Sequence, residues 1–372
     1  MRKVRNIAIA ALIGVGGLYL VSMGSAKPLA PGLRVGVLVS DSGELGFAGS
    51  IQRAAARLAV SDLVDQRSSV KVELSFVDVG STESDYARAF AKLKALRSDV
   101  ILAPIESDSA SSLVDFNTKN PVPIIAPSSL QDDLGISSTK PWFFRLATSP
   151  SQDSYALSEF ISKSKPESTL IVSSSLDSSR AQMKSIAFGL AMSGQRAQTM
   201  NIKDAKAIAK IRPEALVLLS MEESLSFFTA LEGWVEQVPQ VYLVPSNLAD
   251  YSLYPWAGSL KGALALSPRT DIEPGFKSDL AKALGNQAIL GPRGTGVLAL
   301  GQRTYDAVKL AAEARLKAKK DSPEELRVAI SMALKGGMKV FNKQGFFELR
   351  EYSVSRYGSS GTFNQSSIYR PN

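Results

Sequence analysis

Short apolar stretches alternate with amphipathic helical patterns along most of this chain, and this alternation constrains the fold more than any other feature. Leu33–Ser40 has the pattern of a buried strand and is followed by apolar residues at helical spacing from Ile51 to Leu63. Further strands are predicted at 70–77, 100–104 and 122–126, with helices between them. Because short strands separated by helices form parallel β-α-β units, the sequence predicts an α/β fold with doubly wound, Rossmann-like parallel sheets.

A second series of strands and helices begins after Arg145. Ser149-Pro-Ser-Gln152 has the pattern of a helix start. Strands are predicted at 169–173, 215–219 and 240–244, with a weaker one at 198–202. Since 372 residues exceed one ordinary hydrophobic core, we expect two domains.

The last third of the sequence predicts mainly helices. A long helix is expected from about Gly296 to Lys319, and Ser322 with Glu325 has the layout of a capping box for another helix. Residues 346–354 alternate well enough for a strand pair. Residues 358–372 are rich in Gly, Ser and Asn, so we expect a flexible tail.

The amino terminus has the pattern of an export signal. Basic residues among the first five precede an apolar stretch over 7–21, and small residues follow as far as Ala26. Because this stretch is shorter than a bilayer span, cleavage after Ala26 is the first interpretation, and an uncleaved anchor is the alternative. No later segment is long and apolar enough to cross a bilayer. In both cases we expect an exported protein in the periplasm.

No cysteine or histidine occurs in the sequence, which excludes disulfides, thiolate nucleophiles and imidazole bases. Asp41-Ser42-Gly43 lacks the second copy that an aspartic protease needs, and Ser137-Ser-Thr-Lys140 is followed by a proline that opposes the helix of a serine-lysine site. We therefore expect no enzymatic activity, no catalytic residue, no metal ion and no cofactor.

The net charge is +8, and removal of residues 1–26 leaves +5. The densest cationic group lies near the end of a predicted helix, where cations complement the helix dipole; it consists of Arg315, Lys317, Lys319 and Lys320. Basic and aromatic residues are not interleaved, so we expect no nucleic-acid partner.

Serine clusters follow two neighbouring predicted strands. Ser107 and Ser109 come after the strand at 100–104, and Ser128 and Ser129 come after the strand at 122–126. In a parallel sheet both loops emerge at the carboxyl edge, where ligands of open α/β sheets bind. Short hydroxyls and free backbone N–H groups suit a small polar or anionic molecule. Capping of the following helices is the alternative role for these serines.

The sequence resembles the type I periplasmic solute-binding proteins, the Leu/Ile/Val-binding branch of ABC-importer receptors, from about Leu33 to Phe347. The elements that carry the resemblance are Leu33-Arg-Val-Gly-Val-Leu-Val-Ser-Asp-Ser-Gly43, Pro121-Val-Pro-Ile-Ile-Ala-Pro-Ser-Ser129 and Tyr305-Asp-Ala-Val308. The resemblance implies two doubly wound domains that are joined by a three-crossing hinge and close around a ligand. It divides the chain into a signal peptide at 1–26, an amino-terminal lobe at 33–146 plus 269–337, a carboxyl-terminal lobe at 147–268 plus 338–357, and the tail at 358–372.

The resemblance also implies ligand-binding residues in both lobes. Ser107 takes the place of the serine that binds an amino-acid carboxylate in the family. The other implied contacts of the first lobe are Ser42, Gly43, Ser109, Ser128 and Ser129. In the second lobe Ser246 and Asn247 occupy the stretch where the family has an acid for the ligand's ammonium group. Because a buried ammonium without a carboxylate partner is costly, either Glu222 or Glu223 supplies that charge or the ligand is not a simple amino acid.

These observations predict a monomeric substrate-binding protein of an ABC importer. It would capture a small polar solute, either an amino acid, an amide or a small carboxylate, and present it to the importer's membrane subunits. The alternative is a scaffold of the same fold that regulates a cell-envelope partner such as a peptidoglycan synthase. The missing acid at Ser246 and the serine-rich stretch at 173–179 favour that alternative.

Overall fold

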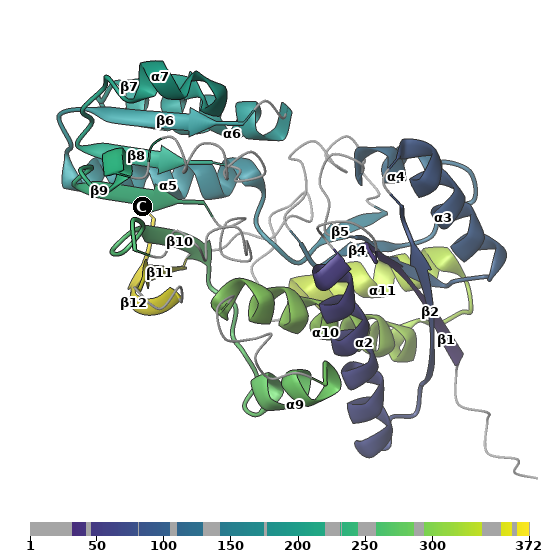
Figure 1. Cartoon of the computed structure of the whole chain (residues 1–372). Helices are drawn as coiled ribbons and strands as arrows, with labels where there is room; N and C mark the ends of the chain where they lie inside the picture. The colour runs from purple at the N-terminus through teal and green to yellow at the C-terminus, as the bar shows by residue number, and fades with distance from the viewer. Residues whose placement is uncertain are drawn as a thin grey trace, which may run out of the picture.

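Two separate β-sheets, each packed against helices, organise the computed structural model of this protein (Figure 1). The structure describes residues 32–41, 46–80, 82–104, 110–128, 142–174, 177–219, 231, 233–244, 258–285, 294–336, 351–358 and 363–371. Among these residues, no helix has the length and apolar character that a membrane span needs.

The first sheet is entirely parallel and has the strand order β2-β1-β3-β4-β5. Its strands are β1 (Gly32–Val39), β2 (Lys71–Asp78), β3 (Val100–Leu102), β4 (Ile124–Ala126) and β5 (Phe143–Arg145). The strands other than β2 are mainly apolar, as the alternation in the sequence predicted, whereas β2 lies at the edge of the sheet and also carries Lys71, Glu73 and Asp78. The chain winds outward from β1 in both directions, so the prediction of a doubly wound α/β sheet is confirmed here.

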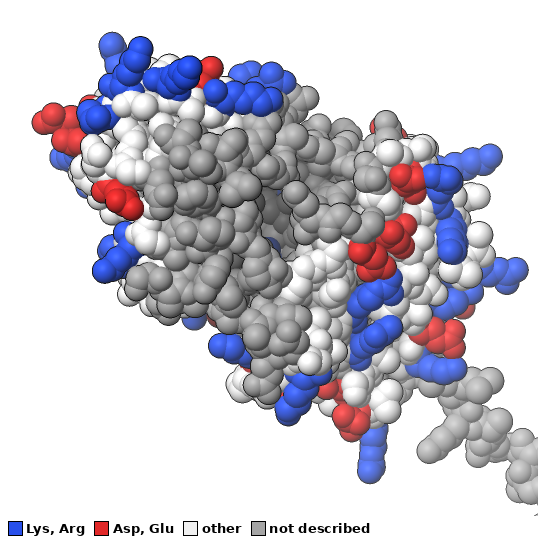
Figure 2. Space-filling view, viewed as in Figure 1, with Lys and Arg blue, Asp and Glu red and all other residues white. Residues whose placement is uncertain are grey.

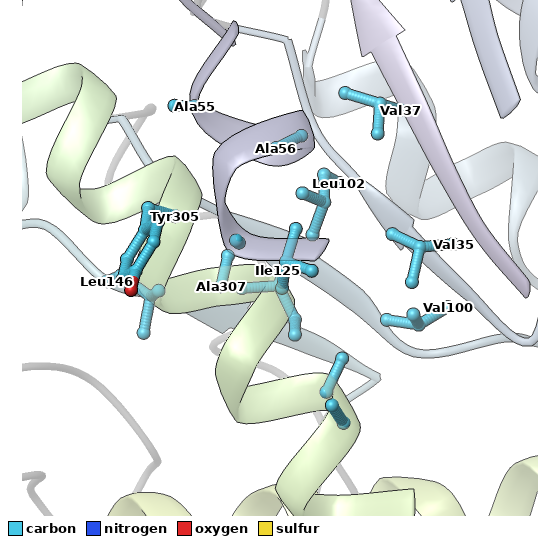
Figure 3. Close-up of a cluster of buried hydrophobic side chains, with 14 of the residues drawn as sticks. Val35, Val37, Ala55, Ala56, Val100, Leu102, Ile125, Leu146, Tyr305 and Ala307 are labelled. Atoms are coloured by element: carbon cyan, nitrogen blue, oxygen red, sulfur yellow. The ribbon is translucent and has the colours of Figure 1, made fainter. Parts of the chain in front are cut away.

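Helices cover both faces of this sheet. One face holds α2 (Gly46–Asp65), α9 (Phe276–Ala283), α10 (Gly294–Lys317) and α11 (Pro323–Gly336), and the other holds α3 (Glu83–Ala95) and α4 (Ala110–Phe116). Alternate strand residues point to opposite faces, so Val37 packs toward α2 while Leu38 packs toward α3. Figure 3 shows Ala55 and Ala56 of α2 and Ala307 of α10 close to the strand side chains.

The second sheet has the order β12-β11-β10-β9-β8-β6-β7. Its strands are β6 (Thr169–Ser173), β7 (Ala197–Asn201), β8 (Ala215–Leu218), β9 (Gln240–Leu243), β10 (Leu264–Pro268), β11 (Tyr352–Tyr357) and β12 (Phe363–Tyr369), and α5 (Pro150–Ser164), α6 (Asp177–Met192), η2 (Ile202–Asp204) and α7 (Ala205–Ile208) belong to the same lobe. Pairing is parallel from β7 to β10 and antiparallel from β10 to β12. The chain crosses between the lobes after β5, after β10 and between α11 and β11.

The two predicted helix starts are present. Ser149 accepts a hydrogen bond from the Gln152 backbone N–H at 3.2 Å, and the Gln152 side chain accepts one from the Ser149 backbone N–H at 2.9 Å. At the start of α11 the Ser322 hydroxyl accepts a hydrogen bond from the Glu325 N–H at 3.3 Å. Both helices therefore begin at the capping serines that the sequence predicted.

The prediction of a flexible tail is wrong for Phe363–Tyr369, because these residues form β12 against β11. Backbone hydrogen bonds, which do not depend on apolar side chains, attach this Ser- and Asn-containing stretch to the sheet. Tyr369 is buried, and its ring lies 5.1 Å from that of Phe160 in an edge-on contact. The strand pair predicted within 346–354 is instead β11 with β12, and residues 346–350 lie outside the described residues.

Candidate ligand-binding site

The carboxyl edge of the first sheet brings together the ends of β1, β3 and β4. Ser128, just after β4, donates a hydrogen bond from its hydroxyl to the Pro104 carbonyl oxygen, just after β3, at 3.3 Å. The Ser128 side chain is partly exposed. The structure thus places the two serine-rich connections side by side where they leave their strands, as the sequence predicted.

Helix α2 starts very close to the end of β1. A Cβ atom on Gly49 would lie 2.3 Å from the Ser40 carbonyl oxygen, so only glycine allows this approach. The amino terminus of α2 is thereby held at the carboxyl edge of the sheet. This arrangement favours a negatively charged group nearby.

Charged residues that sequence reasoning did not assign also lie at this edge. Arg53 of α2 forms an ion pair with Asp41, whose backbone N–H donates to the Asp78 carboxylate at 3.0 Å. Asp41 lies two residues after β1 and Asp78 is the last residue of β2, and an acid at a strand end is the sequence signal that could have identified them. Since their charges have partners, they hold the ends of β1 and β2 together. No group of three or more potential metal ligands occurs among the described residues.

At the matching edge of the second sheet, the serines after β6 bond to their own loop and helix. The Ser174 backbone N–H donates to the Ser179 hydroxyl at 3.0 Å, and the Ser173 hydroxyl contacts the Met183 sulfur at 3.2 Å. Ser174 and Ser179 are buried. These serines therefore order the start of α6.

Ser128 is the one predicted site residue that the structure describes. The others lie outside the described residues; they are Ser42, Gly43, Ser107, Ser109, Ser129, Glu222, Ser246 and Asn247. The segments that hold them adjoin described strand ends of both lobes, at Val39, Leu102 and Leu243 among others.

A buried polar cluster lies where the first crossing enters the second lobe. Asp153 of α5 accepts a hydrogen bond from Thr148, in the crossing, at 2.5 Å. Desolvation, followed by the charge of Asp153, raises the pKa of the Tyr352 hydroxyl, which remains protonated at neutral pH. Desolvation lowers the pKa of Arg303, on α10 of the first lobe, to about 10, and the charge of Asp153 opposes this shift. Asp153 therefore interacts with residues of both lobes.

The family model described as "Periplasmic binding protein" matches residues 32–197. Solved structures match nearly the whole chain. A leucine-binding protein from Thermotoga maritima superposes with a TM-score of 0.71 at 13% identity, covering 91% of this chain and 99% of that protein. The chain has the type I periplasmic binding protein fold. The resemblance inferred from the sequence is thus confirmed.

Two further structures with this fold were solved with ligands. An ABC-transporter solute-binding protein from R. palustris in complex with benzoate has a TM-score of 0.72 at 14% identity, with 91% and 97% of the two chains covered. A branched-chain amino acid transporter substrate-binding protein from Streptococcus pneumoniae, in complex with isoleucine, has a TM-score of 0.70 at 16% identity, with 91% and 99% covered. A search of the curated proteins found no match.

Proposed function

We propose that this chain is the substrate-binding protein of an ABC importer and that it captures a small solute in the periplasm as a monomer. The observation that carries the proposal is its fold: one parallel and one mixed sheet, joined by three crossings, in the arrangement of the type I periplasmic binding proteins. A ligand that contacts both lobes would favour the closed state and shift the population toward it.

The proposed contacts of the first lobe include Ser128, together with residues beyond the described ends of β1, β3 and β4. These are Ser42, Gly43, Ser107, Ser109 and Ser129, and the second lobe contributes Glu222, Ser246 and Asn247. The Ser128 hydroxyl already donates to Pro104 and marks where these segments meet. The approach of α2 to the end of β1 supports a site with helix N–H donors, to which the other proposed serines would add hydroxyl donors. Such donors suit a carboxylate.

We infer that the solute is a small carboxylate without an ammonium group. Structures of this fold were solved with leucine or isoleucine and also with benzoate or 4-hydroxybenzoate, and all of these ligands carry a carboxylate. Ser246 and Asn247 supply no negative charge for an ammonium. The absence of an acidic side chain at Ser246 and Asn247 is thus consistent with a carboxylate solute as well as with a regulatory scaffold. It therefore does not favour the scaffold.

A thermal-shift screen tests this proposal with benzoate, 4-hydroxybenzoate, leucine, isoleucine and their amides. A solute at one hundred times its Kd should stabilise the protein by about 2.7 kcal/mol. Small-angle scattering should show compaction with the same solute. The proposal fails if no small solute stabilises the chain, or if it copurifies from membranes with a peptidoglycan synthase rather than with importer subunits.

Two substitutions locate the site. Ser107→Trp and Ser128→Trp should abolish the stabilisation by solute, whereas Ser69→Trp, at an exposed position on the opposite edge of the first lobe, should preserve it. Stabilisation that persists in both site variants would place the solute elsewhere, even if the protein is a receptor. Stabilisation by leucine but not by benzoate would indicate that Glu222 pairs with the ammonium group of the solute.

A further inference from the structure

The amino ends of the first sheet carry a dense basic surface on the side opposite the carboxyl edge. We call it the amino-edge surface and define it as Arg34 with residues 64–71, 92–99, 117–122 and 315–322, the segments that lead into β1, β2, β3, β4 and α11. It holds eleven Lys or Arg and three Asp, with Glu73 and Asp115 beside it. Figure 2 shows Lys and Arg side chains along the edge of the first lobe that lies away from the second lobe.

Most of these cations form no ion pair with an acid among the described residues, although Lys71 pairs with Glu73 at 2.9 Å. Arg34 pairs with Asp99 at 2.7 Å, and Arg315 pairs with Asp321 at 2.9 Å. The cations that form no ion pair with a described residue and are exposed are Arg67, Lys92, Arg97, Lys119, Lys317, Lys319 and Lys320. The helix dipole accounts for cations in the last turns of α3 and α10 but not for those in the connecting loops.

Exposed aliphatic side chains stand among these cations. Val64, Leu96 and Leu316, at the ends of α2, α3 and α10, are 70%, 49% and 49% exposed. The surface contains no aromatic residue on which a nucleic-acid base could stack. Cations mixed with aliphatic side chains match the boundary between lipid headgroups and acyl chains.

A hollow of about 360 Å³ lies within this surface, next to the start of α11. Four cations line it, Arg34, Lys94, Arg97 and Arg315, together with the acids Asp99 and Asp321, which pair with Arg34 and Arg315. Lys94 is drawn toward the protein because its ammonium donates to the Lys119 carbonyl oxygen at 2.6 Å. The charged side chains of the hollow sum to +2, so it favours an anionic group such as the phosphate of one headgroup.

The chain also enters the first lobe at this surface. β1 begins at Gly32, whose carbonyl oxygen accepts a hydrogen bond from Arg315 at 3.1 Å. The described part of the first lobe therefore begins on this side.

We propose that the amino-edge surface docks on anionic phospholipid headgroups. This inference goes beyond solute capture and rests on the export of the chain. Each Lys or Arg near an anionic bilayer strengthens binding about fivefold, and the attraction weakens as salt rises. Docking through this surface would keep the receptor close to the membrane whether or not a solute is bound.

The first test attaches an environment-sensitive dye to the protein in the form that the cell produces after export. Because the sequence has no cysteine, Leu96→Cys and Met192→Cys can each be labelled at a single site. Met192, 71% exposed on α6 of the second lobe, is the matched control. Vesicles of phosphatidylglycerol with phosphatidylcholine should shift the emission of the dye at position 96 to the blue and leave that at position 192 unchanged. Equal shifts at both positions, or none at position 96, would overturn the proposal.

The second test reverses charge. Vesicle binding should weaken by about tenfold or more in a triple variant that combines Lys119→Glu, Lys319→Glu and Lys320→Glu. A control variant makes the same change in net charge at exposed positions of the second lobe; it combines Lys184→Glu, Lys206→Glu and Lys210→Glu. Its vesicle binding should stay within about twofold of the wild-type value. Equal losses in both variants would mean that net charge alone drives binding. Full competition by soluble glycerophosphate would identify a site for a free phosphate instead of a bilayer, and solute binding, measured in parallel, should be unchanged in every variant.

Discussion

The Tyr352 hydroxyl on β11 donates a hydrogen bond to the Asp153 carboxylate on α5 at 3.3 Å, across 199 residues of sequence. Tyr352 follows the third crossing between the lobes, and Asp153 follows the first. Both side chains are buried, at 2% and 5% exposure. This buried hydrogen bond therefore connects the segments that follow the first and the third crossing, about which the lobes would move.

Loss of this hydrogen bond should destabilise the second lobe. Tyr352→Phe is expected to lower the free energy of unfolding by about 1.5 kcal/mol, because the acceptor is charged. Tyr242→Phe, which removes a neutral 3.2 Å hydrogen bond to Ser164 at a similarly buried ring, should cost about 0.5–1 kcal/mol. Urea denaturation measures both values. In an Asp153→Ala background the Tyr352→Phe loss should nearly vanish, and an undiminished loss would show that the two residues are not coupled.

Acid should weaken the attachment of the last strands to β10. Glu351 accepts hydrogen bonds from Arg370 at 2.6 Å and from Arg269 at 2.5 Å, and these contacts hold its pKa below the ordinary value. A carboxyl whose pKa is lower in the folded state stabilises the protein above its unfolded pKa and loses that contribution as the pH falls through the folded pKa. Stability measured from pH 7 downward should therefore decline more in the wild type than in Glu351→Gln. Parallel curves would contradict this role of Glu351.

Substitution by alanine should change the stability of the protein in opposite directions at two glycines. Gly49→Ala should destabilise the protein by about 1–3 kcal/mol, because the new methyl group would overlap the Ser40 carbonyl oxygen and push α2 away from β1. Gly233, exposed in a helical turn, has open space around it, so Gly233→Ala should stabilise by about 0.4–1 kcal/mol. Thermal melts of the two variants test this difference, and a neutral Gly49→Ala would mean that α2 can shift freely.

The last strand should matter for stability. Tyr369→Ala is expected to cost about 3 kcal/mol, since it removes a buried ring that packs against Phe160. Ile368→Ala, at the adjacent position that is 43% exposed, should change stability by only about 0.5 kcal/mol. Chemical denaturation distinguishes them. Similar small effects at both positions would restore the view of this segment as a loosely attached tail.

Local sequence determined much of the architecture. The period of the apolar residues predicted the strands β1 to β4 and the helices between them, because the inner strands are buried on both faces and the edge strand β2 alternates apolar with polar residues. Ser149 and Ser322 marked helix starts through hydrogen bonds that span only three residues. The pairing of the loops near Pro104 and Ser128 also followed from sequence alone, since parallel strands that are neighbours must end at the same edge.

Tertiary structure alone decided the contacts between distant parts of the chain. β12 has no regular apolar alternation and is held by its pairing with β11, so its local sequence resembles a free tail. Asp153 and Tyr352 meet because three crossings return the chain to the same place, a result that no local spacing encodes. In the same way, cations from loops far apart in sequence gather at one end of the first sheet because parallel strands bring all their amino ends to a single edge.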